Sequence, residues 1–463
     1  MINLRKITIY SLLMGALFNL MSCGVDRWPE YAQDIKLGNW MDSIMRKNYL
    51  WYEDMPSYNN VNLFLTPKEF LSKVISKKDN NISFADSIIE VTLPSYGFEY
   101  SLVRDAKNDT VYNALLTYIV PNSPASKAGL KRGEWIMKVN DRFISRKYET
   151  QLLQSNEALT LTVGIYKEVT PASTDPEKAA VYEVVKDREG VALGNAESVI
   201  EEPIYTHQMI TLADGKKVGY LMYNSCTAGT TAEPEKYNNE LKEIAKTFSQ
   251  ANINTLIVDL RRNQGGSLSC AQLLSTILAP TSYLNKDMAY LNYNNKNTDR
   301  DKTLLFDSKL LANTVNLNLN TILFIISNQT TGAAETIING LNKKVPQLIT
   351  IGATTKGQNI GTEKFTNTEF RWSINPAVCK ISYDADRTLL GGVIPTYAVS
   401  ETSNYIQYLP FGDINETLLN IAIKVLEGTY PPQTSSEAKT ENHLRVLSSQ
   451  TRSVFATGLR VDN

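Results

Sequence analysis

Histidine is nearly absent from this sequence, in which His207 and His443 are the only examples. A Ser-His-Asp triad or a multi-histidine metal site needs several imidazoles or one well-placed imidazole. His443 lies in a polar stretch, and we expect His207 to be an ordinary strand or loop residue. The composition therefore disfavours both kinds of site, and we expect neither a metal ion nor a cofactor.

Cysteine is also scarce, and no pair has the CxxC spacing that is typical of a zinc site. The three later cysteines follow in apolar surroundings, which predicts buried, inert thiols. If the protein is exported, a disulfide between two of these cysteines remains an alternative. The four cysteines are Cys23, Cys226, Cys270 and Cys379.

An excess of charge of one sign is missing too, because the formal net charge is −1. This balance gives no support to a nucleic-acid partner. The chain has 463 residues, of which 43% are hydrophobic, so it can form two or three domains with ordinary cores. No repeat of a length typical of solenoids is visible.

The first 22 residues have the pattern of a signal peptide: Arg5 and Lys6 precede a short apolar run, Ile7–Leu20. The following "LMSC" resembles a bacterial lipobox, which implies cleavage before Cys23 and acylation of that residue. The acyl chains would attach the protein to a lipid bilayer, as an outer-membrane lipoprotein of the cell envelope whose orientation stays open. The alternative is a plain secretory signal followed by an incidental cysteine.

Residues 23–90 predict a small helical module. Aromatic and aliphatic residues recur at helical spacing over Trp40–Trp51. A second helix is indicated by a capping box, in which Thr66 is the N-cap, Pro67 takes the first position and Glu69 follows. We expect the aromatic stripe to form core rather than a ligand site.

Residues 91–168 carry the pattern "SPASKAGLKRGEWIMKVN" between two predicted strand segments. This run resembles a PDZ domain, a class that binds a peptide as an added strand with its terminal carboxylate on backbone N–H groups. The resemblance implies that Tyr96, Gly97 and Phe98 form the carboxylate-binding loop. The alternative is that the domain packs against the rest of the chain and binds nothing.

The second half of the chain alternates strands and helices. Residues 169–217 have a charged, patternless stretch and predict a linker with connecting strands, whereas strands and helices alternate over 218–428. This alternation indicates a mainly parallel sheet, whose sites lie at the carboxyl ends of strands. The polar residues 429–463 predict a disordered tail. The fold class we expect is a multidomain combination of α/β and α+β parts.

Three motifs follow one another in the 218–428 region: "VDLRRNQGG" (Val258–Gly266), "NQTTGAAE" (328–335) and "GGVIPTYAV" (Gly391–Val399). Together with the PDZ-like segment, the chain resembles the tail-specific, or C-terminal processing, serine peptidases over about residues 35–428. The last motif has Thr396 where this family has aspartate. The residues matching the first family motif are Asp259, Leu260, Arg261, Asn263, Gly265 and Gly266.

Both chemical positions of this family are changed. The resemblance places the nucleophilic serine three residues before Glu335, where this chain has Gly332. It places the lysine base in "GATTKGQNIG", where this chain has Gln358. A serine nucleophile needs a side-chain oxygen and a neighbour that takes its proton, and neither glycine nor a carboxamide supplies these.

Two residues could replace the missing pair. Thr331 stands one residue before the nucleophile position, and Lys356 stands two residues before the base position, about 6.6 Å away along an extended chain. A displacement of about 1 Å can already reduce a rate a hundredfold. We expect Thr331 to form turn hydrogen bonds and Lys356 to be a solvated charge.

The sequence therefore predicts an exported lipoprotein with a peptidase fold that is a pseudo-peptidase. We expect it to bind unfolded or C-terminal polypeptide segments without cutting them. The binding positions are Tyr96, Gly97, Phe98, Gly265, Gly266 and Ala333. Two alternatives remain, an active serine-type endopeptidase that uses Thr331 and Lys356, and a purely structural envelope lipoprotein. The bound peptide and the oligomeric state stay open.

Overall fold

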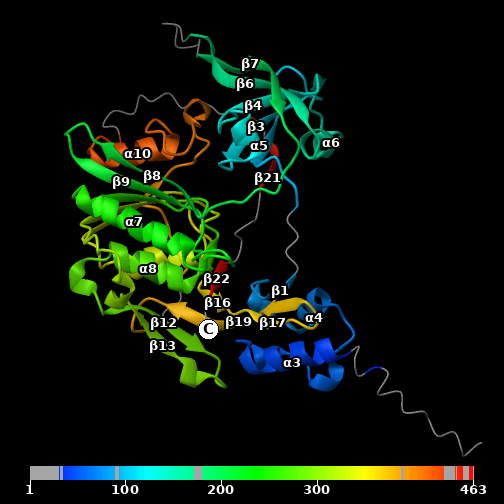
Figure 1. The fold of residues 1–463 in the computed structure, drawn as a ribbon, viewed down its shortest axis with the longest axis vertical. Helices are drawn as coiled ribbons and strands as arrows, with labels where there is room; N and C mark the ends of the chain where they lie inside the picture. Colours follow the sequence, from blue (N-terminus) through cyan, green and yellow to red (C-terminus); the bar gives the residue numbers. More distant parts are fainter. Residues whose placement is uncertain are drawn as a thin grey trace, which may run out of the picture.

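The computed structural model describes residues 31, 35–88, 93–171, 180–386, 390–431, 444, 446–451 and 458–461. The predicted signal segment and the lipidation residue Cys23 lie outside this range. Figure 1 shows an α/β part with helices α7, α8 and α10, a β-rich part around β2–β7, and a small part around α3, α4 and β1. We name these the α/β domain, the β domain and the N-terminal module.

The N-terminal module is helical, as expected. Its first core helix is α3 (Lys36–Asn48), and α4 (Pro67–Val74) begins with the predicted capping box, in which Thr66 N donates to Glu69 Oε2 at 3.1 Å. A short strand, β1 (Phe84–Ser87), follows. Three 3₁₀ turns complete it: Tyr52–Asp54, Tyr58–Asn60 and Lys77–Asp79.

A strand addition fastens this module to the α/β domain. β1 pairs antiparallel with β18 (Trp372–Asn375), which also pairs with β17 (Phe365–Asn367). Met41 and Phe70 of the helices share one core with Ile374 of β18. The module therefore lies against the strands that follow the predicted base position.

The β domain is a sheet in the order β21-β2-β3-β4-β6-β7, with β5 beside β4. Its helices are α5 (Pro124–Lys127) and α6 (Glu149–Leu153). Its strands are β2 (Phe98–Arg104), β3 (Tyr112–Ile119), β4 (Trp135–Val139), β5 (Arg142–Phe143), β6 (Leu159–Thr170) and β7 (Val181–Leu193).

The prediction of a linker over 169–217 is wrong for β7. This strand pairs with β6 along almost its whole length and extends the sheet of the β domain. Most of its residues are exposed or half-buried, so both of its faces carry polar side chains. Such a strand lacks the alternation of apolar and polar residues by which a sequence indicates a strand.

The α/β domain is built on a sheet in the order β20-β15-β14-β10-β9-β8, in which every neighbouring pair except β8 with β9 is parallel. The prediction of a mainly parallel sheet is confirmed. The strands are β8 (Ile204–Thr211), β9 (Lys217–Tyr223), β10 (Thr255–Asp259), β14 (Thr321–Ile326), β15 (Gln347–Gly352) and β20 (Tyr397–Ala398).

Helices cover both faces of this sheet. Successive residues of β10 point to opposite faces, so Leu256 and Val258 join one apolar core and Ile257 joins another. The first core includes α7 (Lys236–Gln250), α8 (Leu268–Leu278) and α9 (Ala333–Leu341), and the second includes α10 (Thr417–Leu426). The carboxyl ends of β10 and β14 remain available for a site.

A second sheet of the α/β domain has the order β11-β22-β16-β19-β12-β13. Its strands are β11 (Gly265–Ser267), β12 (Asp287–Tyr293), β13 (Lys302–Leu305), β16 (Ile360–Thr362), β19 (Ala377–Ser382) and β22 (Gly458–Arg460). The 3₁₀ turns of this domain are Thr281–Tyr283, Thr298–Arg300, Ser308–Leu311 and Tyr405–Gln407.

The prediction of a disordered tail over 429–463 is wrong for two segments. β21 (Val446–Gln450) pairs antiparallel with β2, and β22 lies between β11 and β16. We name β21 and β22 the tail strands. These strands are short and pair with distant parts of the chain, so no local pattern indicated them. The polar composition alone then predicted disorder.

The cysteines that the structure describes are free and buried, as predicted. Burial raises the pKa of the Cys379 thiol to about 12, which keeps it protonated near neutral pH. Within the described residues, His, Cys, Asp and Glu form no cluster that could hold a metal ion. None of the helices in that part of the chain has the length and apolarity of a membrane span.

Buried ion pairs join the β domain to the α/β domain. Arg262 Nη2 lies 2.7 Å from Glu99 Oε1 on β2, and the Glu99 side chain is 0% exposed. Arg132 of the β domain pairs with Glu401, which also lies 2.9 Å from Arg261. Burial would raise the pKa of Glu401, but the charges of Arg132 and Arg261 outweigh burial, so that its pKa is lowered.

We predict that Arg262→Ala destabilises the protein by about 3–5 kcal/mol, because it removes the partner of a buried carboxylate. The shift of the urea unfolding midpoint measures this. Lys246→Ala is the matched control, since the Lys246–Glu243 pair is exposed and its removal is expected to cost less than about 1 kcal/mol. Equal effects of the two substitutions would contradict a role of Arg262 in joining the domains.

Candidate functional site

Gly332 lies in a sharp turn between β14 and α9. It is the N-cap of α9 and has φ 58° and ψ −112°, a backbone conformation that residues with a side chain adopt only under strain. Thr330 stabilises the turn, because its hydroxyl donates to the Leu260 carbonyl at 2.8 Å and accepts from Ser327 N at 3.0 Å. The turn is therefore fixed to the carboxyl end of the neighbouring strand β10.

The Glu335 carboxylate brings the two predicted chemical positions together. Its Oε2 accepts hydrogen bonds from Gly332 N at 2.9 Å and from Gln358 N at 2.8 Å. Its Oε1 accepts from Gly357 N at 2.6 Å and from the Thr355 hydroxyl. Glu335 is 2% exposed, so one buried carboxylate holds the start of α9 and the loop after β15 in place.

The loop that carries Gln358 is also fixed from its other side. Thr355 Oγ1 accepts from Val393 N at 2.7 Å, and a Cβ on Gly357 would lie 2.6 Å from Gly392 N. The "GGVIPTYAV" motif therefore packs on the base loop. Thr396, which stands at the family's aspartate position, hydrogen bonds through its backbone N to Thr350 Oγ1 at 2.8 Å.

The glycine turn after β10 forms a third side of the site. The buried Asn263 shapes it by accepting from Gly265 N at 3.0 Å and donating to the Tyr223 carbonyl at 2.9 Å. Gly265 and Gly266 have φ 108° and 125°, which only glycine adopts without strain. With Ala333 at the start of α9, the predicted groove positions of the α/β domain lie around one site.

A tail strand occupies the space next to Gly332. A Cβ built on Gly332 would overlap the Gly458 carbonyl and lie 2.7 Å from Leu459 N. A Cβ on Gly265 would overlap the same carbonyl group. The peptide bond between Gly458 and Leu459 therefore lies where the side chain of a nucleophile would be.

The rescue candidates do not form a nucleophile and base pair here. The Thr331 hydroxyl donates to Gln358 Oε1 at 3.2 Å, and an amide oxygen is not a base that could activate it. Lys356 is exposed, and within the described part of the chain its amine makes no hydrogen bond or ion pair. A lysine base needs burial to favour its neutral form.

An open cavity of about 370 Å³ adjoins these residues. The N-terminal module supplies one wall, with Asn80, Asn81, Ile82 and Phe84, none of which belongs to the aromatic stripe over Trp40–Trp51 that was predicted to form core. The other lining residues are Gln264, Thr331, Lys356, Gly357, Gln358 and Gly458. The cavity is large enough for a side chain or a short peptide segment beside the tail strand.

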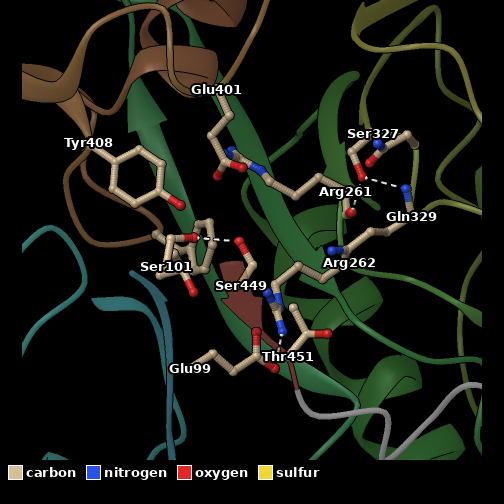
Figure 2. A pocket seen from close by; sticks show the side chains of 13 residues that line it. Glu99, Ser101, Arg261, Arg262, Ser327, Gln329, Glu401, Tyr408, Ser449 and Thr451 are labelled. Carbon is tan, nitrogen blue, oxygen red and sulfur yellow. Dashed lines mark hydrogen bonds and ion pairs between the residues drawn. The ribbon is translucent and has the colours of Figure 1, made fainter. Parts of the chain in front are cut away.

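A second cavity, of about 170 Å³, lies between the β domain and the α/β domain. Figure 2 shows Arg262 reaching Glu99, and Ser449 of the tail facing Ser101, with their hydroxyls 2.7 Å apart. Arg261 lies on the opposite wall, where it pairs with Glu416 at 2.8 Å. The tail therefore passes through the interface that the buried ion pairs form.

The predicted carboxylate-binding loop of the β domain already uses part of its hydrogen-bonding capacity. Gly97 N donates to Ser95 Oγ at 3.0 Å, and the Gly97 carbonyl accepts from Val120 N at 2.8 Å. The Tyr96 ring stacks on Phe98 with centroids 5.8 Å apart. Tyr96, Gly97 and Phe98 are thus together at the start of β2, on whose edge β21 lies.

Sequence reasoning missed several residues of the site. The tail strands come from segments far along the chain. So do Glu401 and Glu416, which pair with Arg261, and no local pattern indicated any of these contacts. One signal was available in the tail, since Leu459 and Val461 alternate with Arg460 directly after a glycine. This alternation is typical of a strand but is too short to stand out alone.

We predict that Glu335→Gln destabilises the protein by about 3 kcal/mol, because a neutral amide replaces a charged acceptor of several buried donors. Chemical denaturation measures this, and hydrogen exchange at Gly357 and Gln358 should accelerate at least about tenfold. The control is Glu427→Gln, whose exposed carboxylate accepts from Ala213 N, and whose effect should stay near 0.5 kcal/mol. Unchanged exchange in Glu335→Gln would refute the bridging role.

Comparisons with known proteins identify the family of this chain. The model of peptidase family S41 matches residues 217–399, and that of the peptidase S41 N-terminal domain matches residues 37–86. A solved structure from Bacteroides fragilis NCTC 9343, assigned to the S41 proteases, is 41% identical with a TM-score of 0.77; the match covers 84% of this chain and 97% of that one. No curated protein matches the chain.

Two further solved structures match most of this chain at low identity. A photosystem II D1 C-terminal processing protease is 13% identical over 80% of this chain and 95% of its own, with a TM-score of 0.44. A peptidase structure from Parabacteroides merdae ATCC 43184 is 14% identical over 86% and 98% of the two chains, with a TM-score of 0.39. The match at 41% identity and the family models do show the family, and the predicted resemblance is confirmed: this chain belongs to peptidase family S41, the C-terminal processing peptidases.

Proposed function

We propose that this protein is a pseudo-peptidase, which holds an extended polypeptide segment in its groove without cutting it. The observation that carries this proposal is the pair of residues at the chemical positions. Gly332 and Gln358 donate to one oxygen of Glu335, so the site is assembled, but neither has a group that can attack a carbonyl. The backbone of the site is therefore in place, although the side chains that the reaction needs are absent.

The expected loss of rate is very large. Removal of the nucleophile in a serine peptidase lowers kcat by about a million-fold, and about 10³–10⁴-fold remains over water from binding and oxyanion donors. Thr331 would need to transfer its proton, but its hydroxyl donates to a carboxamide oxygen. The alternative of an active Thr331 and Lys356 endopeptidase therefore lacks a geometric basis.

The binding of polypeptide is supported by two strand edges. β11 and β16 accept a strand between them next to Gly332, and β2 accepts a strand on its outer edge. Strand addition to a sheet edge is how PDZ domains bind peptides, so the antiparallel pairing on β2 supports the PDZ-like assignment of the β domain. In the alternative of a purely structural envelope protein, these edges serve only to hold the chain's own tail strands.

The proposal includes a place in the cell. The signal-like residues 1–22 and the cysteine that follows them support export and attachment to a membrane by acylated Cys23, which makes the protein an outer-membrane lipoprotein. Its partners would then be the lipid bilayer and unfolded or C-terminal segments of other polypeptides. Radiolabelled palmitate incorporation that is lost in Cys23→Ala tests the anchor directly.

We predict that the purified protein produces no fragments from unfolded casein or from labelled peptides with apolar C-termini, because position 332 has no nucleophile. Gel electrophoresis and mass spectrometry measure this. Thr331→Ala and Lys356→Ala should leave this result unchanged. Turnover that either substitution abolishes would overturn the pseudo-peptidase proposal in favour of the alternative enzyme.

We also predict that Gly332→Ser together with Gln358→Lys restores slow cleavage, whereas either substitution alone does not, because the reaction needs both a nucleophile and a base. The first bond cut should be Gly458–Leu459, which lies next to position 332. Intact mass spectrometry then shows loss of residues 459–463. A folded double variant that cuts at a different place would contradict the assignment of Gly332 to the nucleophile position.

A further inference from the structure

The tail strands follow two separate binding edges of the molecule. β21 pairs with β2 of the β domain, and β22 pairs in parallel with β11, in the register Gly265↔Gly458, Gly266↔Leu459 and Ser267↔Arg460. In Figure 1, β21 lies at the β domain and β22 lies beside β16. One stretch of chain thus contacts both edges that a bound peptide would use.

Gly458 occupies a position that favours glycine. It has φ 62°, and a Cβ on it would lie 2.7 Å from Gln358 Oε1 and 2.9 Å from Gln358 Cδ. Its carbonyl group lies against the α-carbons of Gly265 and Gly332, and Gly458 N donates to the Gln264 carbonyl at 3.0 Å. The carboxamide at the former base position is therefore a wall of a glycine subsite.

The residues after Gly458 enter apolar subsites. Leu459 is 0% exposed and Val461 is 3% exposed, and both belong to the core of the α/β domain. Gly361 leaves room for Val461, because a Cβ on Gly361 would lie 2.6 Å from Val461 Cγ2. Backbone bonds fix the register, since Val461 N donates to the Thr362 carbonyl at 2.8 Å.

The contact of β21 differs in kind. Val446 is 47% exposed, and most of this strand is exposed, so its pairing with β2 depends on backbone hydrogen bonds and on the contact of Ser449 with Ser101. Specificity in the tail therefore comes from β22, and β21 adds a second, less selective point of attachment.

We propose that the groove is a binding site for a glycine followed by apolar residues at the first and third positions after it, and that its resident ligand is the chain's own tail, residues 446–451 and 458–461, bound in cis. This rests on the proposed function and names its ligand class. A foreign polypeptide binds only when it displaces β22, and it must present glycine to Gln358 and apolar side chains to the sites of Leu459 and Val461. A tethered segment typically acts at an effective concentration on the order of mM, so weak competitors are excluded.

The test uses the full chain and a fluorescent synthetic peptide with the sequence of residues 444–463. The intact protein should bind this peptide poorly, because its own tail fills the groove. Gly458→Val in the protein forces a branched side chain into the glycine subsite, and it should increase affinity for the unchanged peptide at least about tenfold. Fluorescence anisotropy measures both affinities, and circular dichroism verifies that the variant is folded.

The peptide itself supplies matched controls. Val461→Ala in the peptide should weaken binding to the Gly458→Val protein about tenfold, from loss of buried methyl groups. Val446→Ala, the same change at an exposed position, should alter binding less than about twofold. Gly458→Ala in the peptide should weaken it about tenfold, because φ 62° is strained for alanine and the Gln358 side chain must move to admit a Cβ. Equal effects of the two valine changes would overturn the subsite assignment.

A second measurement does not depend on a variant that could misfold. A recognition site for a specific protease, inserted after Pro431, allows the protein to fold intact and then to be cut. The released tail should stay bound after the cut. The fluorescent peptide should replace it faster than unrelated peptides do. We also expect the Leu459 and Val461 amides of the uncut wild-type chain to be protected from hydrogen exchange.

The outcomes separate this proposal from the proposed function. If the intact protein binds unrelated unfolded peptides readily and its Leu459 and Val461 amides exchange freely, the cis ligand is refuted while a peptide-binding pseudo-peptidase stands. If the amides are protected but the cut protein binds no foreign peptide, the cis contact is supported and general peptide binding fails. If neither protection nor any peptide binding is found, both proposals are overturned.

Discussion

The buried carboxylate of Glu335 is the interaction on which the site depends. It accepts backbone hydrogen bonds from Gly332, Gly357 and Gln358 and a side-chain bond from Thr355, so it connects the start of α9 to the loop after β15. These donors belong mostly to the backbone, whose hydrogen bonds do not depend on which side chain stands at position 332 or 358. The shape of a peptidase site therefore persists when its reactive side chains are absent.

The fold and the reaction make different demands on the turn after β14. A backbone with φ 58° and ψ −112° is strained for serine and comfortable for glycine, so Gly332 costs the fold nothing at this position. Catalysis needs an oxygen on a Cβ and a nearby base, which the fold does not require. The absence of a side chain leaves space that the Gly458 carbonyl fills, so that the tail strand β22 lies next to Gly332.

Much of this structure was predictable where the signals were local. The capping box at Thr66, the strand–turn–helix around Gly332 and the parallel sheet follow from patterns within a few residues. Strand β7 was missed because most of its residues are exposed or half-buried and show no alternation, and β21 was missed because it is mostly exposed and pairs through its backbone and one serine contact. Arg261 pairs locally with Asp259, but its other partners, Glu401 and Glu416, lie 140 and 155 residues further along the chain, and no local pattern indicates such a contact.

The central claim is that the assembled site cannot form a covalent bond to a substrate carbonyl. The most direct test is to treat the full chain with a fluorophosphonate, which phosphonylates activated serine and threonine hydroxyls with loss of fluoride, and to measure the intact mass. The account predicts an unchanged mass for the wild-type protein and a single adduct for the Gly332→Ser, Gln358→Lys protein. A stoichiometric adduct on any hydroxyl of the wild-type protein would contradict it.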